Sequence, residues 1–341
     1  MSASLINSLY YYHDSPKIDI LVNEDTFGIA KLLANISTIH LFSYNEKEKN
    51  NLVQEKIIIK KIFRNYDLSI NLTSSDRSVF YSFLASNYSI SAIDNNPIKS
   101  WWKKIILKKY YFIDEKKHIL LNNLEPLNLL NIQHNYVQQV PDIDKKLYLN
   151  LKKKLSKKNI KDFIIFHPSA QYNYKIYPKH LRDKLLLHLN TLGIPILVTG
   201  SLNKIDTKIK EELTPLENVY DMIGETSIAE YFALSDLALA YVGMDTLNMH
   251  IAAGQNKPIF AIFGPTFLKI WSPWSNQLQT AASKNMPYQT YGNITIFQAN
   301  MQCVACGKEG CGDSGRSECL FLIDPKKIFN KVQSWFNNAR I

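Results

Sequence analysis

The sequence predicts an α/β protein with two domains, each built on a parallel sheet. The chain has 341 residues, which is more than one domain of ordinary size contains. Short β-rich runs alternate with amphipathic segments of helical length, and this alternation is typical of βαβ units. The alternation stops at a lysine-rich segment, Asp142–Lys161, and then starts again. We therefore expect a polar linker there between two α/β halves.

The first half is expected to contain four strands with helices between them. Each expected strand is a short run of apolar residues, and each expected helix carries apolar residues at helical spacing. The strands are Ile18–Val22, Thr38–Phe42, Leu68–Leu72 and Tyr88–Ala92, and the helices are Met1–Tyr12, Thr26–Ala34, Leu52–Arg64 and Arg77–Ser86. The apolar face of the first helix is formed by Leu5, Ile6, Leu9 and Tyr12. Core packing is expected for Tyr10–Tyr12, Trp101 and Trp102, and stacking on a sugar is the alternative.

The second half repeats the pattern and ends in a helix. Its expected strands are Phe163–Phe166, Pro195–Thr199, Asp236–Val242 and Pro258–Phe263, and its helices are Lys179–Thr191, Ile205–Leu213, Ser227–Leu234 and Thr246–Gly254. The segment Pro325–Ile341 has Ile328, Val332, Trp335 and Phe336 on one stripe, so we expect a helix that packs back across the domain seam. The predicted domains are residues 1–150 and 151–324, followed by the helix 325–341.

Composition and charge narrow the class of protein. A hydrophobic fraction of 46% and a charged fraction of 21% exclude a wholly disordered chain. We find no apolar run near the roughly 20 residues that span a bilayer, and no signal-peptide pattern at Met1–Leu5, so a cytoplasmic protein is expected. The net charge of +10 favours anionic partners such as nucleic acid, anionic lipid or phosphorylated glycans. A solvated, lysine-rich surface is the other interpretation.

Polar residues follow each expected strand of the second half. Ligands of open α/β sheets bind beyond the carboxyl ends of the strands, so these residues are candidates for a binding site. Ser169 and Lys175 follow the first strand, in a turn that suits a phosphate, and Gly200 follows the second. Asp245 and Thr246 follow the third strand and open a helix, whose N-terminus attracts anions. Each loop alone also fits an ordinary turn.

Four cysteines lie close together near the end of the chain. Cys303, Cys306, Cys311 and Cys319 are the only cysteines of the protein. Such clustering in a cytoplasmic chain favours a local metal site over disulfides, and four thiolates suit a tetrahedral Zn²⁺ or an iron ion. The prediction is one structural metal ion in the 303–319 loop. Four reduced cysteines without metal are the alternative.

Several motifs together resemble those of one enzyme family. His167–Ala170, Lys175–Pro178, Gly224–Ile228, Asp245–His250 and Phe263–Thr266 occur in the order and spacing of motifs of the ADP-heptose:lipopolysaccharide heptosyltransferases, glycosyltransferase family nine. The resemblance covers roughly Phe163–Pro273, and Phe263–Thr266 matches its motif unchanged. It implies a GT-B fold, in which two Rossmann-like domains with parallel sheets face each other across a cleft.

The resemblance also implies an activity and a donor site. The activity is inverting transfer of heptose from ADP-heptose to a lipopolysaccharide inner-core acceptor, without a catalytic metal. The N-terminal domain would face the acceptor and the C-terminal domain would hold the donor. Lys175 would contact the donor phosphate, Asp245 would contact the heptose, and Thr246 would hold the diphosphate. His250 would lie close beneath this site, and Thr226 would border the adenine. Ser169 and Gly200 complete the expected donor-binding residues.

The chain departs from the family pattern in three places. Leu247 stands where the signature has glycine, and Lys204 and Asp206 lie near a position that the family often fills with an acidic residue. The family's first strand and its Gly-Asp loop, with the presumed catalytic base, would fall just before Met1. We therefore expect an upstream extension that encodes them, and leave the catalytic residue unassigned. Within the given chain the nearest candidate bases are His13, Asp14, Asp19 and Asp25.

Two rival functions remain at this point. One is a catalytically impaired paralogue that binds sugar nucleotide or lipopolysaccharide precursor. The other is a nucleic-acid-binding protein with a four-cysteine metal site, but the basic residues are dispersed, so no nucleic-acid partner is expected. The basic charge favours an enzyme that is peripheral to the inner membrane and contacts its anionic surface.

Overall fold

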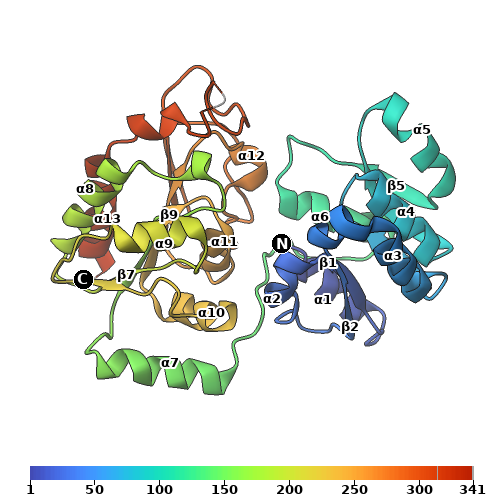
Figure 1. Ribbon diagram of the computed structural model, residues 1–341, viewed down its shortest axis with the longest axis horizontal. Helices are drawn as coiled ribbons and strands as arrows, with labels where there is room; N and C mark the ends of the chain where they lie inside the picture. The colour runs from blue at the N-terminus through green and yellow to red at the C-terminus, as the bar shows by residue number, and fades with distance from the viewer. Residues whose placement is uncertain (313, 340–341) are drawn as a thin grey trace. The chain divides into compact units, whose positions relative to one another are not determined.

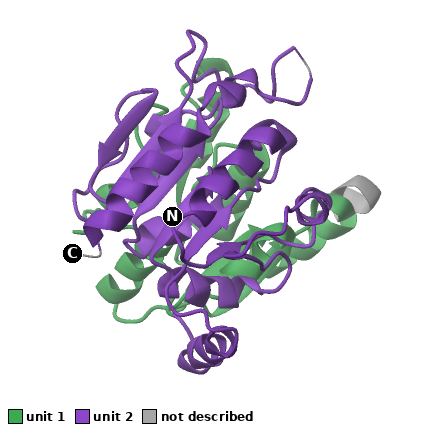
Figure 2. Cartoon of the chain, turned by 90° about the vertical axis from the view of Figure 1, so that its left-hand side faces the viewer, with its two compact units in different colours: residues 1–142 green, residues 143–341 purple. Residues whose placement is uncertain are grey.

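The chain forms two compact units. The computed structural model describes residues 1–312 and 314–339, and the side chains of all of these except 46–51. Contacts divide the chain into Met1–Asp142 and Ile143–Ile341, which we call unit 1 and unit 2 (Figure 2). The division falls at the start of the lysine-rich segment that the sequence analysis marked as the boundary.

Unit 1 alternates helices with short parallel strands (Figure 1). Strands β1 and β2 pair with each other, and β3, β4 and β5 form a second sheet in that order, all in parallel. The strands are β1 (Asp19–Asn23), β2 (Thr38–Phe42), β3 (Leu68–Asn71), β4 (Tyr88–Ile93) and β5 (Lys109–Phe112). The helices are α1 (Ala3–Tyr12), α2 (Phe27–Ala30), α3 (Tyr44–Ile62), α4 (Asp76–Ala85), α5 (Pro97–Ile106) and α6 (Ile119–Leu129).

Unit 2 is built on one seven-stranded sheet with the order β11-β12-β10-β9-β6-β7-β8. Only β11 runs antiparallel to its neighbour. The strands are β6 (Ile164–His167), β7 (Ile196–Val198), β8 (Val219–Asp221), β9 (Ala240–Met244), β10 (Ile259–Phe263), β11 (Tyr288–Tyr291) and β12 (Ile294–Gln298). The helices are α7 (Lys145–Lys157), α8 (Lys179–Asn190), α9 (Lys204–Glu211), α10 (Ile228–Leu237), α11 (Leu247–Gly254), α12 (Leu268–Trp271) and α13 (Pro325–Ala339).

The strand order of unit 2 creates a topological switch point between β6 and β9. The chain proceeds from β6 to β7 and β8 on one side, and then returns to add β9 and β10 on the other side. The two loops that leave β6 and β9 therefore diverge at the carboxyl edge of the sheet. Such a point is where ligands of open α/β sheets bind. Apolar side chains of the central strands and of α8 and α13 form the core beneath it.

The fold class and most expected elements of the sequence analysis are confirmed, with corrections at four places. The expected helix Leu52–Arg64 starts earlier, because α3 begins at Tyr44. The expected polar linker contains α7, which Asp144 caps and which buries Leu151 and Leu155. Lysines outnumber apolar residues there, and this composition hid the helical spacing. The expected strand Asp236–Val242 is shifted, because α10 continues to Leu237 and the strand β9 begins at Ala240. The expected helix Thr26–Ala34 is shorter, since α2 ends at Ala30.

Expected burial is wrong for several aromatic residues. Helix α1 buries Leu5 and Ile6 as predicted, but Tyr11 and Tyr12 are exposed. Trp101 is also exposed, whereas Trp102 is partly buried. In the C-terminal helix, α13 buries Ile328, Val332 and Phe336 and packs on α8 within unit 2. Residues 340–341 of that expected helix lie outside the described residues.

Candidate active site

The loops after β6 and β9 start from strands that lie unusually close together. Gly243 of β9 pairs with His167 of β6, and a Cβ atom built on Gly243 would lie 2.4 Å from the carbonyl oxygen of His167. A side chain at position 243 would therefore push the two strands apart at the edge where their loops diverge. Glycine at this position permits the close approach.

Lys175 and Asp245 meet at the switch point. Lys175 ends the short 3₁₀ helix Asn173–Lys175 that follows β6, and Asp245 directly follows β9. The Nζ atom of Lys175 donates to Oδ2 of Asp245 at 2.9 Å. The Asp245 side chain is buried, and about a quarter of the Lys175 side chain is exposed. The buried Asp245 carboxylate therefore holds the Lys175 ammonium in place, and the Lys175 side chain remains partly open to solvent.

Helix α11 begins beside this pair. Thr246 occupies the N-cap position, but its hydroxyl makes no capping hydrogen bond and lies 3.4 Å from the Tyr241 hydroxyl. The N–H groups of the first helical turn are thus not engaged by the Thr246 side chain, as an anion site at a helix start requires. The side chain of Leu247 is exposed at the first helical residue. His250 lies one turn further on, and its backbone N–H donates to the carbonyl oxygen of Thr246.

A buried carboxylate holds the loops after β6 and β7 together. Asp206 lies on α9, and its carboxylate accepts hydrogen bonds from the hydroxyls of Ser169 and Ser201, the Ser201 N–H and the Asn203 amide. A Cβ atom on Gly200 would lie 3.1 Å from this carboxylate, so glycine leaves room for it. The hydroxyl of Ser169, expected to bind the donor, is therefore engaged within the protein. Ser169 and Gly200 shape the loops around the switch point.

His167 is buried at the end of β6. Its ring lies 3.0 Å from the Thr199 hydroxyl and within 3.2 Å of the Asn248 amide. Burial lowers the pKa of His167 to about 4, although the charge of Asp206 and the contact with Thr199 raise it. The imidazole is thus neutral at physiological pH and serves as a fixed polar link between β6, β7 and α11.

Thr226 lies further away in the sheet. It follows β8, which is separated from β6 by β7, and it directly precedes Ser227, the N-cap of α10. Ser227 and Glu230 form a capping box there. Lys175, Asp245 and Thr246 thus lie together, Ser169 and Gly200 lie in the neighbouring loops, and Thr226 lies two strands from β6.

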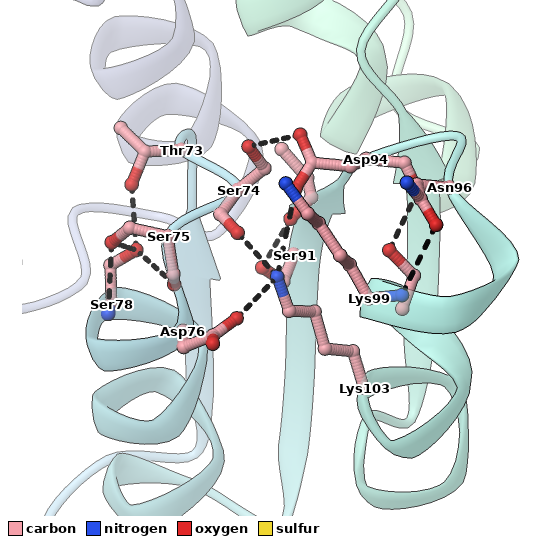
Figure 3. Close-up of polar contacts among 12 residues, drawn as sticks. Thr73, Ser74, Ser75, Asp76, Ser78, Ser91, Asp94, Asn96, Lys99 and Lys103 are labelled. Atoms are coloured by element: carbon pink, nitrogen blue, oxygen red, sulfur yellow. Dashed lines mark hydrogen bonds and ion pairs between the residues drawn. The ribbon is translucent and has the colours of Figure 1, made fainter.

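Unit 1 carries its own polar cluster, at the carboxyl ends of β3 and β4 (Figure 3). At its centre is Lys103 of α5, whose side chain is 1% exposed. The Lys103 ammonium lies 2.8 Å from Asp76 and 3.8 Å from Asp94, and donates to the carbonyl oxygen of Ser74 at 2.6 Å. The Ser74 hydroxyl donates to Asp94 at 2.8 Å. The cluster joins the first turn of α4 and the last turn of α5 to the strand ends. Sequence reasoning missed it because Lys103 lies far along its helix.

The candidate bases from the sequence analysis lie at different ends of β1. His13 and Asp14 precede this strand, and Asp19 begins it, where Tyr66 donates to its carboxylate at 2.9 Å. Asp25 follows the strand, at its carboxyl end. Of these four residues, Asp25 is therefore the one at the edge where ligands of parallel sheets bind.

Comparison with known proteins decides the family. The family model described as glycosyltransferase family 9 (heptosyltransferase) matches residues 57–299. The chain belongs to glycosyltransferase family 9. This family-9 chain is 24% identical over 285 residues to lipopolysaccharide heptosyltransferase 3 of Escherichia coli, covering 82% of each protein. It is 26% identical over 249 residues to lipooligosaccharide heptosyltransferase 2 of Haemophilus influenzae, covering 64% of the chain and 66% of that protein.

Solved structures show the fold of this glycosyltransferase. A family 9 glycosyltransferase from Veillonella parvula matches with a TM-score of 0.74 at 14% identity, covering 99% of this chain and 93% of that one. The ADP-heptose heptosyltransferase II of E. coli matches with a TM-score of 0.69 at 15% identity, over 100% and 95%. An E. coli heptosyltransferase solved with ADP matches with a TM-score of 0.68 at 15% identity, covering 98% of this chain and 97% of that one. The predicted GT-B fold class, with its parallel sheets, is confirmed.

The four cysteines of the family-9 chain lie in one loop near its C-terminal helix, and all four are free thiols. Cys319 is buried, and its pKa is raised to about 11, first by burial and then by Cys311, Cys306 and Cys303. This shift favours the neutral thiol of Cys319, whereas Zn²⁺ or iron would be held by thiolates. In residues 1–312 and 314–339, no three Cys, His, Asp or Glu side chains converge as metal ligands. The thiols therefore lack the geometry of a closed site.

Proposed function

We propose that this glycosyltransferase transfers a heptose from ADP-heptose to a lipopolysaccharide inner-core acceptor, with inversion at the anomeric carbon. The names of its relatives in E. coli and H. influenzae support the heptose and the acceptor class. The family structure solved with ADP supports the donor. The observation that carries the proposal is the Lys175–Asp245 pair beside the start of α11, at the topological switch point of unit 2.

In the proposed reaction, an acceptor hydroxyl attacks the anomeric carbon of the heptose from the face opposite the diphosphate. Its proton passes to a base, the bond from the anomeric carbon to the diphosphate oxygen breaks, and ADP leaves with the electron pair. Negative charge then grows on the diphosphate. The Lys175 ammonium and the first N–H groups of α11 are suited to stabilising it. Asp245 orients Lys175 and has a carboxylate that a heptose hydroxyl can bind.

We assign the donor to unit 2 and the acceptor to unit 1, and propose that the enzyme acts at the cytoplasmic face of the inner membrane. Unit 1 offers carboxylates at the carboxyl ends of its strands, including Asp25 after β1 and Asp94 after β4. A carboxylate within reach of the acceptor hydroxyl is a suitable base for the proton. No metal takes part in this reaction scheme, so transfer in the presence of EDTA is part of the proposal.

Replacing Lys175 with alanine tests the donor site. The variant loses a charge-assisted hydrogen bond to phosphate, so ADP binding is expected to weaken by about 1–3 kcal/mol, or roughly 5- to 150-fold. Isothermal titration with ADP measures this loss. Lys179→Ala is the matched control, because the exposed Lys179 side chain pairs with Asp183 one turn further along the same helix, α8. Equal ADP affinity of folded Lys175→Ala and wild-type protein would refute the site. Donor binding without any heptose transfer by the wild type would instead favour an impaired paralogue.

We also propose that Cys303, Cys306, Cys311 and Cys319 bind one structural Zn²⁺ or iron ion. Protein purified without chelator is expected to contain about one metal ion per chain by elemental analysis. Cys311→Ser is expected to lose the metal, and Ser314→Ala in the same loop is expected to keep it. Metal-free protein whose four thiols all react freely in the folded state would contradict this proposal.

A further inference from the structure

Helix α5 of unit 1 turns an apolar face outward. Ile98 is 84% exposed, Trp101 61% and Ile105 73%. These residues are spaced by three and four positions, so they lie on one side of the helix. Figure 1 shows α5 at the periphery of unit 1, next to β5. The exposed rings of Tyr110 and Phe112 on β5 extend the apolar surface, with Lys104 lying over both. We call Ile98, Trp101, Ile105, Tyr110 and Phe112 the α5 patch.

The opposite side of α5 is held in the protein. Lys103 is bound by Asp76, Asp94 and Ser74, as described above, and the buried Ser100 hydroxyl donates to the carbonyl oxygen of Asp94 at 2.7 Å (Figure 3). Leu107, just after the helix, packs with Val79 and Ile93. These contacts fix the rotation of α5 about its axis. The α5 patch is therefore the outer surface of a well-anchored helix.

Exposed lysines lie beside the patch, and the nearest acidic residues in sequence, Asp94, Asp114 and Glu115, lie just outside the segment that carries them. The segment from Asn95 to Ile113 contains five lysines and no acidic residue. Lys99, Lys104 and Lys108 are exposed. Lysines beside outward Trp and aliphatic side chains are typical of helices that lie in the interface of an anionic bilayer. A second copy of the chain is a poor occupant, because a symmetric contact would bring the same lysines face to face.

We propose that the α5 patch docks this protein on the surface of an anionic lipid bilayer. The aliphatic side chains and Trp101 would enter the boundary between headgroups and acyl chains, and the lysines would contact anionic headgroups. At ten residues α5 is about 15 Å long, half of the roughly 30 Å hydrocarbon thickness, so it lies on the membrane. Within the described part of the chain, no helix has the length and apolar character needed to cross a membrane. The proposal does not depend on sugar transfer, because vesicle binding tests it alone.

Co-flotation of the full chain with vesicles is the test. Wild type is expected to bind vesicles of phosphatidylcholine with 30% phosphatidylglycerol, and to bind pure phosphatidylcholine vesicles far less. Trp101→Ser with Ile105→Ser is expected to weaken binding at least tenfold. Replacing Lys99, Lys104 and Lys108 with glutamine is expected to weaken it about a hundredfold at low salt. Leu52→Ser with Ile57→Ser is the matched control, since it removes exposed apolar residues from α3 of the same unit.

A second measurement localises the contact. Lipids with brominated acyl chains are expected to quench tryptophan fluorescence of the wild type, and Trp101→Phe is expected to lose that quenching while still binding. Equal binding by the α5 and α3 variants would overturn the proposal, as would equal binding to neutral and anionic vesicles. Self-association through the patch, seen by sedimentation without vesicle binding, would also overturn it. Unchanged thermal unfolding of the exposed-site variants verifies that they are folded.

Discussion

Replacing Asp206 with alanine is expected to lower the free energy of unfolding by about 1–3 kcal/mol. The buried carboxylate accepts hydrogen bonds from Ser169, Ser201 and Asn203. Its removal leaves the buried Ser169 hydroxyl without an acceptor, whereas Ser201 and Asn203 are exposed and can bond to water. A buried polar group that loses its partner costs about 1–3 kcal/mol. Urea unfolding followed by circular dichroism measures the change.

The control for Asp206→Ala is Asp162→Ala, an exposed aspartate before β6, for which we expect a change within about 0.5 kcal/mol. The two variants would unfold alike if the Asp206 network were unimportant. ADP affinity gives a second readout, because the network also fixes the loop between β6 and Lys175. A weakened ADP affinity in Asp206→Ala under conditions where it is folded would link the network to the donor site.

Acidification from pH 7.5 to 4.5 is expected to destabilise the wild type through His167. The folded pKa is about 4 and the ordinary value is 6.5, so between these values the unfolded chain binds a proton that the folded chain does not. The stability contributed by the neutral ring is complete above pH 6.5 and is lost as the pH falls towards 4. The difference of about 2.5 pKa units corresponds to about 3 kcal/mol over the full range.

His167→Gln separates this effect from the titration of carboxylates. The variant is less stable than wild type at pH 7.5, and the difference is expected to shrink by about 2–3 kcal/mol at pH 4.5. Urea midpoints at both pH values measure it. His180→Gln, which replaces an exposed histidine, controls for the loss of one imidazole. Parallel loss of stability in wild type and His167→Gln would contradict the assignment.

The sequence predicted the parts of the fold that depend on local patterns. The strands of unit 2 are short apolar runs, so β6 and, apart from its exact start, β9 followed from general α/β rules. The same rules made Lys175 and Asp245 candidates for a binding site, but their ion pair was not predicted. Helix α7 was missed because lysines outnumber apolar residues in it and hide the helical spacing of Leu151 and Leu155. Local patterns do not show which side of a helix meets the core. The burial of Trp101 was therefore predicted wrongly.

The polar networks needed three-dimensional information. Asp206 and Ser169 are 37 residues apart in sequence, and Lys103 and Ser74 are 29 apart. Their contacts depend on which strands are neighbours and on the direction of each helix. Asn203 at the N-cap of α9 was a readable signal for a helix start, but nothing in the sequence indicated that Asp206 would turn back toward Ser169.

The anchoring of Lys103 bears on how quickly the protein can reach a bilayer. Segments that fold only at a membrane must lose conformational entropy when they bind, and this slows and weakens their binding to the membrane. Helix α5 is already folded, and the buried Lys103 ammonium fixes its rotation about the helix axis. Every molecule in solution therefore presents the α5 patch ready to bind a membrane. The arrival rate is then limited by diffusion and by attraction of the lysines. Between landings the apolar face stays in water, and the same lysines, by repelling those of other copies, keep concentrated molecules apart.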